Sequence, residues 1–216
     1  MIISIDGPAG SGKSTVAEIL SKRLGFIHFN SGSLYRAVTA YLMDKKVDIS
    51  DISTDSPTFD FDINVQMQDN HQVVIVNGTD YSTRLRDNNI SILTPKVSSN
   101  RSIRKLIDDC QRRFCREHNV VIEGRDIGSF VFPDAEYKFY LDCDVNVRAK
   151  RRLKEELEKN SKITLKDVEN QLKQRDLADK NKKIAPLVIP NGAFIIDSSH
   201  LNTDEVVDKM LEHIQI

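Results

Sequence analysis

The chain has 216 residues, of which 39% are hydrophobic, and its formal net charge is -1 at pH 7. This length suits one domain, or one domain with an inserted subdomain, and the balanced charge gives no reason to expect nucleic acid or an acidic membrane as a partner. No apolar run approaches the roughly 20 residues of a membrane span and the first residues lack a signal-peptide pattern, so we expect a soluble, cytoplasmic protein. We also expect it to act as a monomer, although the sequence does not give the oligomeric state.

Short apolar runs alternate with helical patterns along most of the chain. Apolar runs of this kind between helices are typical of parallel strands that are covered on both faces. Thr164 followed by Asp167 is typical of a capped helix start. The pattern predicts an α/β fold with strands at 1–5, 26–29, 120–124, 138–142 and 193–197, and helices at 14–24, 101–117, 145–159, 165–181 and after Thr203.

One segment interrupts this alternation. Residues 47–70 contain six Asp and no Lys or Arg, and residues 71–86 carry an Asn-Gly dipeptide between β-forming residues. Such a dipeptide is a hairpin signal. We predict a small β-rich insertion here, and an acidic surface loop followed by an edge hairpin is enough to explain its structure.

The segment IDGPAGSGKST, residues 5–15, contains the complete P-loop pattern G-x-x-x-x-G-K-S. Its glycines let successive backbone N–H groups point inward, and these donors and the start of the next helix form a phosphate cradle. In such a loop Lys13 reaches the β- and γ-phosphates of ATP, and the Ser14 hydroxyl binds Mg²⁺. We predict that ATP and Mg²⁺ are bound by Gly7, Pro8, Ala9, Gly10, Ser11, Gly12, Lys13, Ser14 and Thr15.

A P-loop alone does not distinguish kinases from GTP switches or motor ATPases. A GTP switch usually carries an NKxD sequence that reads the base, and the nearest counterpart is NKKI, residues 181–184, where Ile replaces Asp. The chain is also short for a motor ATPase. A small-molecule kinase is therefore favoured over a nucleotide-dependent switch protein, and the acceptor must be sought elsewhere in the sequence.

A first candidate acceptor cluster is NSGSLYR, residues 30–36, which follows a predicted strand. Ligands of α/β proteins bind at the carboxyl ends of strands. A helix that begins at Leu34 and is capped by Ser31 or Ser33 explains the segment equally well. The candidates for binding an anionic acceptor are Ser31, Tyr35 and Arg36.

A second cluster is EGRDIGS, residues 123–129, directly after the strand VVI. Glu123 stands where P-loop proteins often place an acidic residue near Mg²⁺, and Arg125 and Asp126 follow it in the loop. A structural ion pair is the alternative. A charged pair at the ligand-binding edge of a sheet favours function.

Two further clusters lie on predicted helices, where exposed salt-bridged faces are the simpler explanation. In RDLADKNK, spacings of four and seven residues predict one mixed-charge stripe of Arg175, Asp179 and Lys182. In RAKRR, arginines on a closing lid can stabilise a phosphoryl-transfer transition state. The alternative is a basic solvated face whose charges are matched by Glu155 and Glu156. These arginines are Arg148, Arg151 and Arg152.

Together these motifs resemble the bacterial cytidylate (CMP) kinases, a branch of the nucleoside monophosphate kinases. The resemblance runs through IDGPAGSGKST, SGSLYR, RDNN (86–89), GRDIGS with VFPDA (124–135), and RD with a second Asp and APL (175–187). It is strongest in these blocks and weak between them. The β-rich insertion at 62–86 also resembles the family's enlarged monophosphate-binding region.

The resemblance implies a role for each matched residue. Arg125 and Asp126 match the pair that contacts the cytosine and the phosphate side of CMP, and Arg148 and Arg152 match lid residues near ATP. It implies catalytic roles for Lys13, Arg125, Arg148 and Arg152, and substrate binding by Ser31, Tyr35, Arg36, Arg104, Arg125, Asp126, Arg175, Asp179 and Lys182.

Four positions depart from the family pattern. The family usually has Asp at the positions of Asn30 and Glu123, and Arg at the position of Lys182, where a point charge replaces a bidentate fork. Pro95 aligns with a serine that contacts the base, although two serines follow closely. Only Pro95 bears directly on cytosine recognition, and it leaves the choice between CMP and UMP open.

The resemblance implies a P-loop NTPase fold of three layers that phosphorylates CMP and dCMP with ATP and Mg²⁺. The alternatives are a kinase for another small acceptor, such as UMP or a shikimate-like acid, and the switch protein. We expect one kinase domain over 1–216, with the core at 1–35, 101–147 and 183–216, a monophosphate-binding insertion at about 36–100, and a lid at about 148–165.

Overall fold

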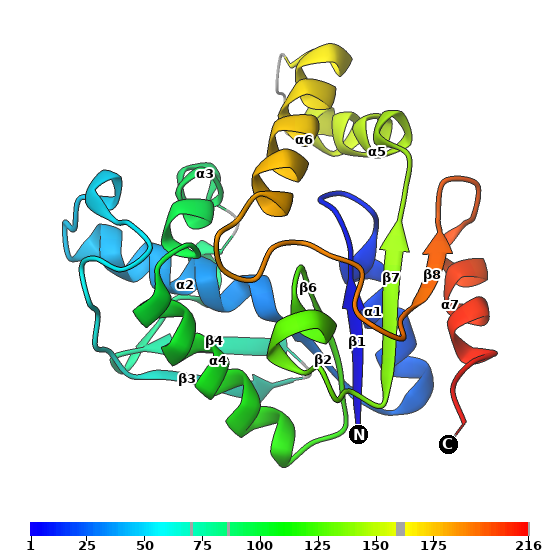
Figure 1. Cartoon of the computed structure of the whole chain (residues 1–216), viewed down its shortest axis with the longest axis horizontal. Coiled ribbons are helices and arrows are strands. Elements are labelled where there is room, and N and C mark those ends of the chain that lie inside the picture. The colour runs from blue at the N-terminus through cyan, green and yellow to red at the C-terminus, as the bar shows by residue number, and fades with distance from the viewer. Residues whose placement is uncertain (70, 86, 159–162, 216) are drawn as a thin grey trace. The chain divides into compact units, whose positions relative to one another are not determined.

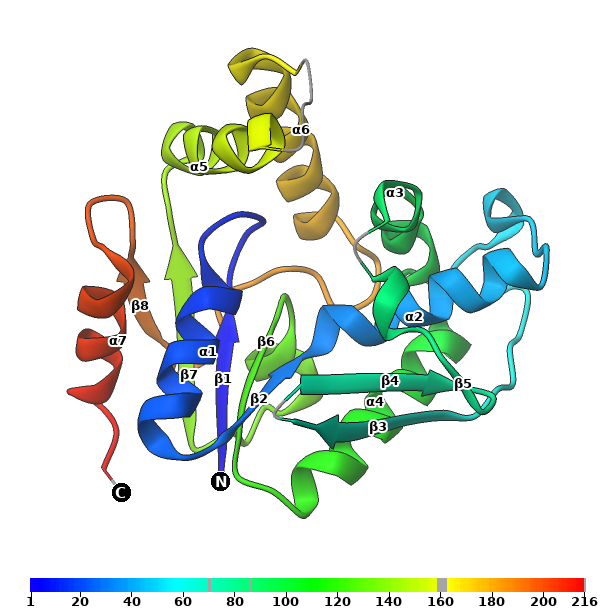
Figure 2. The ribbon, with the colours of Figure 1, turned by 180° about the vertical axis from the view of Figure 1, so that it is seen from behind.

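The computed structural model describes residues 1–69, 71–85, 87–158 and 163–215. The chain forms two compact units, Met1–Phe26 together with Val121–Ile216, and Ile27–Val120. Figure 1 presents the elements of both units, and Figure 2 presents them from behind. Within the described residues, no helix combines the length and the apolar character needed to cross a membrane.

The first unit is built around a sheet of mainly apolar strands. These strands lie in the order β6 (Val120–Gly124), β1 (Ile2–Asp6), β7 (Tyr137–Asp142) and β8 (Phe194–Asp197). β1 pairs with β7, and β7 with β8, in parallel. The predicted α/β fold with a mostly parallel sheet is therefore confirmed.

Helices α1 (Lys13–Leu24) and α7 (Thr203–Leu211) pack beside each other against this sheet (Figures 1 and 2). Their apolar residues share one buried core with the strands. Burying such side chains removes apolar surface from water, which is the main stabilising term in folding. The core includes Ile3, Ile5, Val16, Leu20, Phe139, Leu141, Val207 and Met210.

Helices α5 (Val145–Glu158) and α6 (Leu165–Lys180) pack against each other, with Ala149 and Leu172 in their shared apolar cluster. The predicted start of α6 is confirmed, because the side chains of Thr164 and Asp167 each accept the other's backbone N–H. The predicted lid is described only in part, since its residues 159–162 lie outside the described residues.

The second unit contains β2 (Ile27–Asn30), a small antiparallel sheet, and the helices α2 (Ser31–Asp44), α3 (Asn88–Val97) and α4 (Arg101–Arg116). The sheet has the order β3 (Ile63–Gln68), β4 (His71–Val76) and β5 (Thr79–Asp80). Between β4 and β5, Asn77 and Gly78 have φ values of 46° and 78°. The predicted Asn-Gly hairpin is thus confirmed.

Parts of the second unit differ from the prediction. The acidic segment expected as a surface loop ends in strand β3, where Ile63 and Val65 are buried at alternate positions. Helix α3 is not among the predicted helices, and it contains Pro95, although proline lacks the N–H that an interior helix position donates. Arg86 of the RDNN block lies outside the described residues.

Candidate functional site

The P-loop joins β1 to α1, which is the strand–loop–helix context that the motif requires. A Cβ at Gly7 would lie 2.2 Å from the carbonyl oxygen of Leu141, so the loop leaves no room for a side chain there. Gly12 caps α1 in the left-handed conformation, with φ 93°. The first-turn amides of α1 have no side-chain cap from Gly12, and such amides attract anions.

Lys13 is buried inside this loop. Its Nζ donates hydrogen bonds to the carbonyl oxygen of Pro8, at 2.7 Å, and to Oγ of Ser11, at 3.3 Å. Burial lowers the pKa of Lys13 well below its ordinary value, and the Arg125 charge acts in the same direction. A phosphate anion in the loop would favour the charged form of Lys13.

Ser14 and Glu123 supply the candidate metal ligands. Oγ of Ser14 donates to Oε1 of Glu123 at 2.5 Å, and Glu123 is buried near the end of β6. Both groups are hard oxygen ligands that suit Mg²⁺, which proteins commonly hold by one or two carboxylates together with substrate phosphates. The described residues contain no group of three His, Cys, Asp or Glu side chains that could hold a metal alone. Ser14 and Glu123 fit Mg²⁺ because they place two oxygen ligands together beside the P-loop.

Three charged side chains from two predicted clusters meet in the first unit. Nε of Arg125 lies 3.0 Å from Oδ2 of Asp179, and Nζ of Lys182 lies 3.0 Å from Oδ1 of Asp179. Burial alone would raise the pKa of Asp179, but the Arg125 and Lys182 charges lower it below its ordinary value. Lys182 follows the end of α6 at Lys180, so its predicted place on the same helix is wrong although its contact with Asp179 remains.

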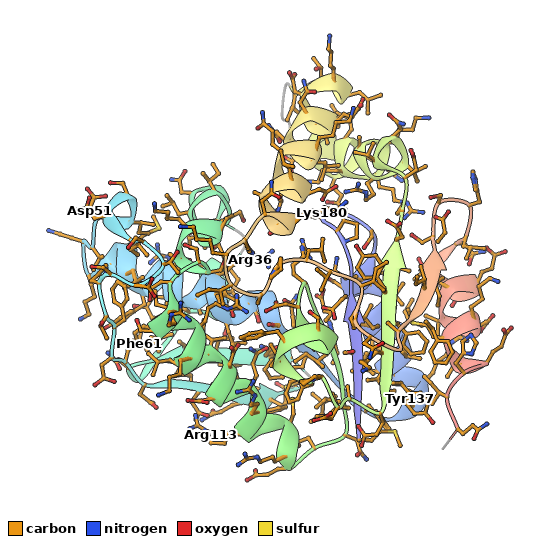
Figure 3. The ribbon with its side chains drawn as sticks, in the orientation of Figure 1. Arg36, Asp51, Phe61, Arg113, Tyr137 and Lys180 are labelled. Carbon is orange, nitrogen blue, oxygen red and sulfur yellow. The ribbon has the colours of Figure 1, made fainter. Side chains whose placement is uncertain are left out.

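The arginines of α5 have different surroundings. Arg148 is buried, and its guanidinium donates to the carbonyls of Cys143 and Ala9 at 2.9 Å and pairs with Asp176 at 2.7 Å. Arg151 donates to the carbonyl of Ser198. A cavity of about 250 Å³ beside the Arg148–Asp176 pair is lined by Pro8, Tyr140, Asp142, Arg148, Asp176, Lys180, Leu187, Val188 and Ile189. Lys180 is labelled in Figure 3 at the end of α6.

Arg152 resembles an exposed surface residue more than a buried one. Its side chain is 45% exposed and pairs with Glu155 at 3.0 Å and Glu156 at 2.6 Å, as the surface alternative predicts. The Glu155 side chain is exposed, and surface ion pairs of this kind contribute about 1 kcal/mol or less, whereas the Glu156 side chain is largely buried. Arg152 can therefore exchange the Glu155 contact at small cost.

In the second unit, the predicted acceptor residues lie on α2 and α4. Ser31 and Tyr35 are buried on α2, and Arg36, labelled in Figure 3, follows them. The guanidinium of Arg104 on α4 lies 5.6 Å from the centre of the Tyr35 ring, and its Nη1 donates to the carbonyl of Ser98 at 3.3 Å. The structure thus brings Tyr35 and Arg104 together.

The cap of α2 differs from the capping alternative. The helix begins at Ser31 rather than Leu34, and the side chain of Asn30 accepts the N–H of Ser33 at 3.1 Å. The assignment of the cap to Ser31 or Ser33 is therefore wrong. Capping does not explain why Ser31 is present.

The serines that follow Pro95 are engaged with helix carbonyls. Oγ of Ser98 donates to the carbonyl of Pro95 at 3.0 Å, and Oγ of Ser99 donates to that of Lys96 at 2.6 Å. A hydroxyl has one proton to donate. Either serine can therefore still accept a hydrogen bond from a base without breaking these contacts.

Comparison with known proteins decides the family. The sequence model of the family described as cytidylate kinase matches residues 3–216. The chain belongs to the cytidylate kinase family. It is 40% identical to the cytidylate kinase of Clostridium botulinum (strain Loch Maree / Type A3) over 217 residues, covering 99% of this chain and 97% of the relative. It is 41% identical to that of Lactobacillus johnsonii over 220 residues, covering 100% and 94%.

Solved structures show the same fold at low sequence identity. The shikimate kinase of Acinetobacter baumannii in complex with shikimate has a TM-score of 0.52 at 13% identity, covering 98% of this chain and 91% of that one. That of Bacteroides thetaiotaomicron has a TM-score of 0.51 at 12% identity, covering 100% and 99%. The family resemblance read from the motifs is confirmed, so the chain is a kinase of the nucleoside monophosphate class, and the switch alternative is not favoured.

Sequence reasoning missed Asp6. This residue ends β1, is fully buried, and accepts the N–H groups of Ile127 at 2.8 Å and Gly128 at 2.7 Å. The available signal was a charged residue at the end of an apolar strand, directly before the P-loop. Burial raises the pKa of Asp6 to about 7, and the two backbone N–H groups oppose that rise.

Asp6 gives folding stability a specific pH dependence. Because its pKa is higher in the folded chain than the ordinary value of 3.8, the folded state binds the proton more tightly. Its contribution to stability is therefore present below about pH 4 and declines as pH rises toward about 7, by up to ~1.4 kcal/mol per pH unit. Urea unfolding at several pH values should show wild type losing stability relative to Asp6→Asn as pH rises from about 4 to about 7. A constant difference would contradict this assignment.

Proposed function

We propose that the chain transfers the γ-phosphoryl group of ATP to CMP and dCMP, giving CDP, dCDP and ADP. The observation that carries this proposal is the construction of the first unit, where the P-loop and the cluster of Arg125, Asp179 and Lys182 belong to one compact body. The names of the curated relatives support cytidine monophosphate as the acceptor.

On the donor side, we propose that the P-loop amides bind the phosphates of ATP. Lys13 would exchange its bond to the Pro8 carbonyl for bonds to the β- and γ-phosphates. The phosphate charges would favour the protonated form of Lys13, which burial disfavours. Ser14 and Glu123 would hold Mg²⁺, which when bound neutralises charge on the phosphates. The phosphate of CMP is already anionic, so the reaction needs no strong general base and depends on positioning and charge neutralisation.

On the acceptor side, we propose that Asp179 accepts the ribose hydroxyls while Arg125 binds the phosphate and, with Asp126, contacts the cytosine. Asp179 suits this role because its low pKa keeps it an acceptor at neutral pH. The remaining residues would bind the phosphate through their positive charges and hydroxyls. They are Ser31, Tyr35, Arg36, Arg104, Arg175 and Lys182.

We propose that residues 148–165 act as a lid that closes on ATP and excludes water. Arg152 would supply charge to the transferred group, since its side chain is part exposed and its pair with exposed Glu155 is weak. Arg148 would act differently, by holding the P-loop through its bond to the carbonyl of Ala9. We further propose that residues 36–100 form the monophosphate-binding insertion and that the enzyme works as a cytoplasmic monomer.

An acceptor panel tests this function. ADP release is measured with CMP, dCMP, UMP, AMP and shikimate, each with and without Mg²⁺. We expect CMP and dCMP to raise the rate by about a hundredfold or more over ATP alone, only with Mg²⁺. A higher rate with UMP or shikimate than with CMP would identify another acceptor and contradict the proposed one. Slow hydrolysis that no acceptor changes would support a switch protein.

A further inference from the structure

One buried carboxylate joins two segments of the first unit. Asp6 is followed directly by Gly7 of the P-loop, and its Oδ1 and Oδ2 accept the N–H groups of Ile127 and Gly128. Ile127 directly follows Arg125 and Asp126 in the chain. The strand that leads into the P-loop is therefore bonded to the loop that carries the acceptor-side pair.

The geometry at Ile127 and Gly128 requires two acceptors. These residues begin the short π-helix η3 (Ile127–Val131), and the first amides of a helix have no acceptor within it. The Asp6 carboxylate supplies one oxygen to each amide. An asparagine has one acceptor oxygen, and its NH₂ group would face an N–H donor. The site is therefore specific for Asp at this position.

Gly128 fixes how closely η3 lies against β1. A Cβ at Gly128 would lie 2.7 Å from Oγ of Ser4, 3.1 Å from Cγ of Pro190 and 3.2 Å from Cδ of Lys138. Any side chain would push the segment away from the strand and lengthen the bonds to Asp6. The Asp6 carboxylate thus bonds η3 to β1, and the absence of a side chain at Gly128 allows η3 to lie close enough for those bonds.

We propose that Asp6 is a positioning residue, which fixes the Arg125–Asp126 loop against the strand of the P-loop and so sets the acceptor geometry of the reaction. This inference rests on the proposed function. It assigns Asp6 no contact with either nucleotide. Its loss should therefore affect the acceptor more than ATP, because the P-loop keeps its own glycines and Lys13.

Asp6→Asn tests the proposal, with Ser4→Ala as a matched buried control on the same strand. Oγ of Ser4 has no hydrogen-bond partner among the described residues, so its removal should leave activity unchanged. At pH 8, where Asp6 is ionised, we expect kcat/KM for CMP to fall about tenfold or more in Asp6→Asn, with KM for ATP within about twofold of wild type. Equal losses for both substrates, or no loss, would overturn the proposal.

Hydrogen exchange gives a readout that does not depend on activity. The amides of Ile127 and Gly128 should exchange about tenfold faster in Asp6→Asn and at the wild-type rate in Ser4→Ala. Unchanged protection of these amides would overturn the proposal even if activity fell. If CMP does not raise ADP release by the wild-type protein, the proposed function is refuted instead. Faster exchange of the Ile127 and Gly128 amides in Asp6→Asn would in that case still confirm the bonds to Asp6.

Gly128→Ala extends the test to the other side of the contact. We expect it to raise KM for CMP, and Ser4→Ala/Gly128→Ala to recover part of that loss, because the shortest contact is with Oγ of Ser4. Recovery follows from the geometry because the double variant removes the atom that the new methyl group meets. An effect of Gly128→Ala on ATP alone would contradict the proposal.

Discussion

The Lys13→Ala variant is expected to lose phosphoryl transfer by about a thousandfold while the chain still folds. Lys13 contributes the ammonium of the P-loop, and its Nζ donates to the Pro8 carbonyl and to Oγ of Ser11. Burial opposes its charge in the folded chain, so its removal should cost little stability. ADP release with saturating ATP and CMP measures the activity, and thermal unfolding measures the fold.

Lys22→Ala is the matched control, since Lys22 lies on the same helix and its side chain forms an exposed pair with Glu18. We expect this control to keep wild-type activity. Near-normal turnover by Lys13→Ala would refute the assignment of the P-loop as the ATP site. Loss of activity in both variants would show that the effect is not specific to Lys13.

The Asp179→Ala variant is expected to raise KM for CMP, or lower kcat, by about tenfold or more, with little change in ATP binding. Asp179 is buried between Arg125 and Lys182, so its carboxylate both organises these cations and offers an acceptor for ribose hydroxyls. Initial rates at varied CMP and fixed ATP give the two kinetic constants. A direct titration with ATP gives donor binding.

Asp179→Asn distinguishes the two parts of this role, because it keeps an acceptor oxygen but removes the charge. Recovery of KM in Asp179→Asn would assign the effect to the hydrogen bond, and its absence would assign the effect to the ion pairs. Glu169→Ala on the same helix is the control, since Glu169 forms an i,i+4 pair with Lys173. Wild-type kinetics in Asp179→Ala would show that Asp179 forms structural ion pairs and does not bind the ribose.

Local motifs predicted much of the fold. The P-loop context, the capped start of α6 and the Asn77-Gly78 hairpin each depend on residues close together in sequence, whose backbone preferences are strong. Strand β3 lies within the predicted β-rich insertion at 62–86, but the acidic residues before it favoured a surface loop over 47–70, so no separate strand was predicted there. Helix α3 was not among the predicted helices, and Pro95 within it is an unfavourable residue inside a helix.

The contacts of the site were harder to predict. Arg125 and Asp179 are 54 residues apart, and the motifs placed each in a separate cluster. The family resemblance assigned both to substrate binding but did not predict their ion pair. Asp6 was passed over because a lone Asp at a strand end has no motif, and its partners are backbone amides, which the sequence does not mark. The pair of Arg148 and Asp176 was missed for a related reason, since Arg148 was assigned to a lid rather than to the P-loop.

The central claim is that the γ-phosphoryl group goes from ATP to CMP rather than to water. Phosphorus NMR of the enzyme with ATP, Mg²⁺ and CMP follows every phosphate in one sample. We predict that the two phosphate signals of CDP grow at the same rate as those of ADP, with no matching growth of inorganic phosphate. Growth of ADP and inorganic phosphate while CMP stays unchanged would contradict the account.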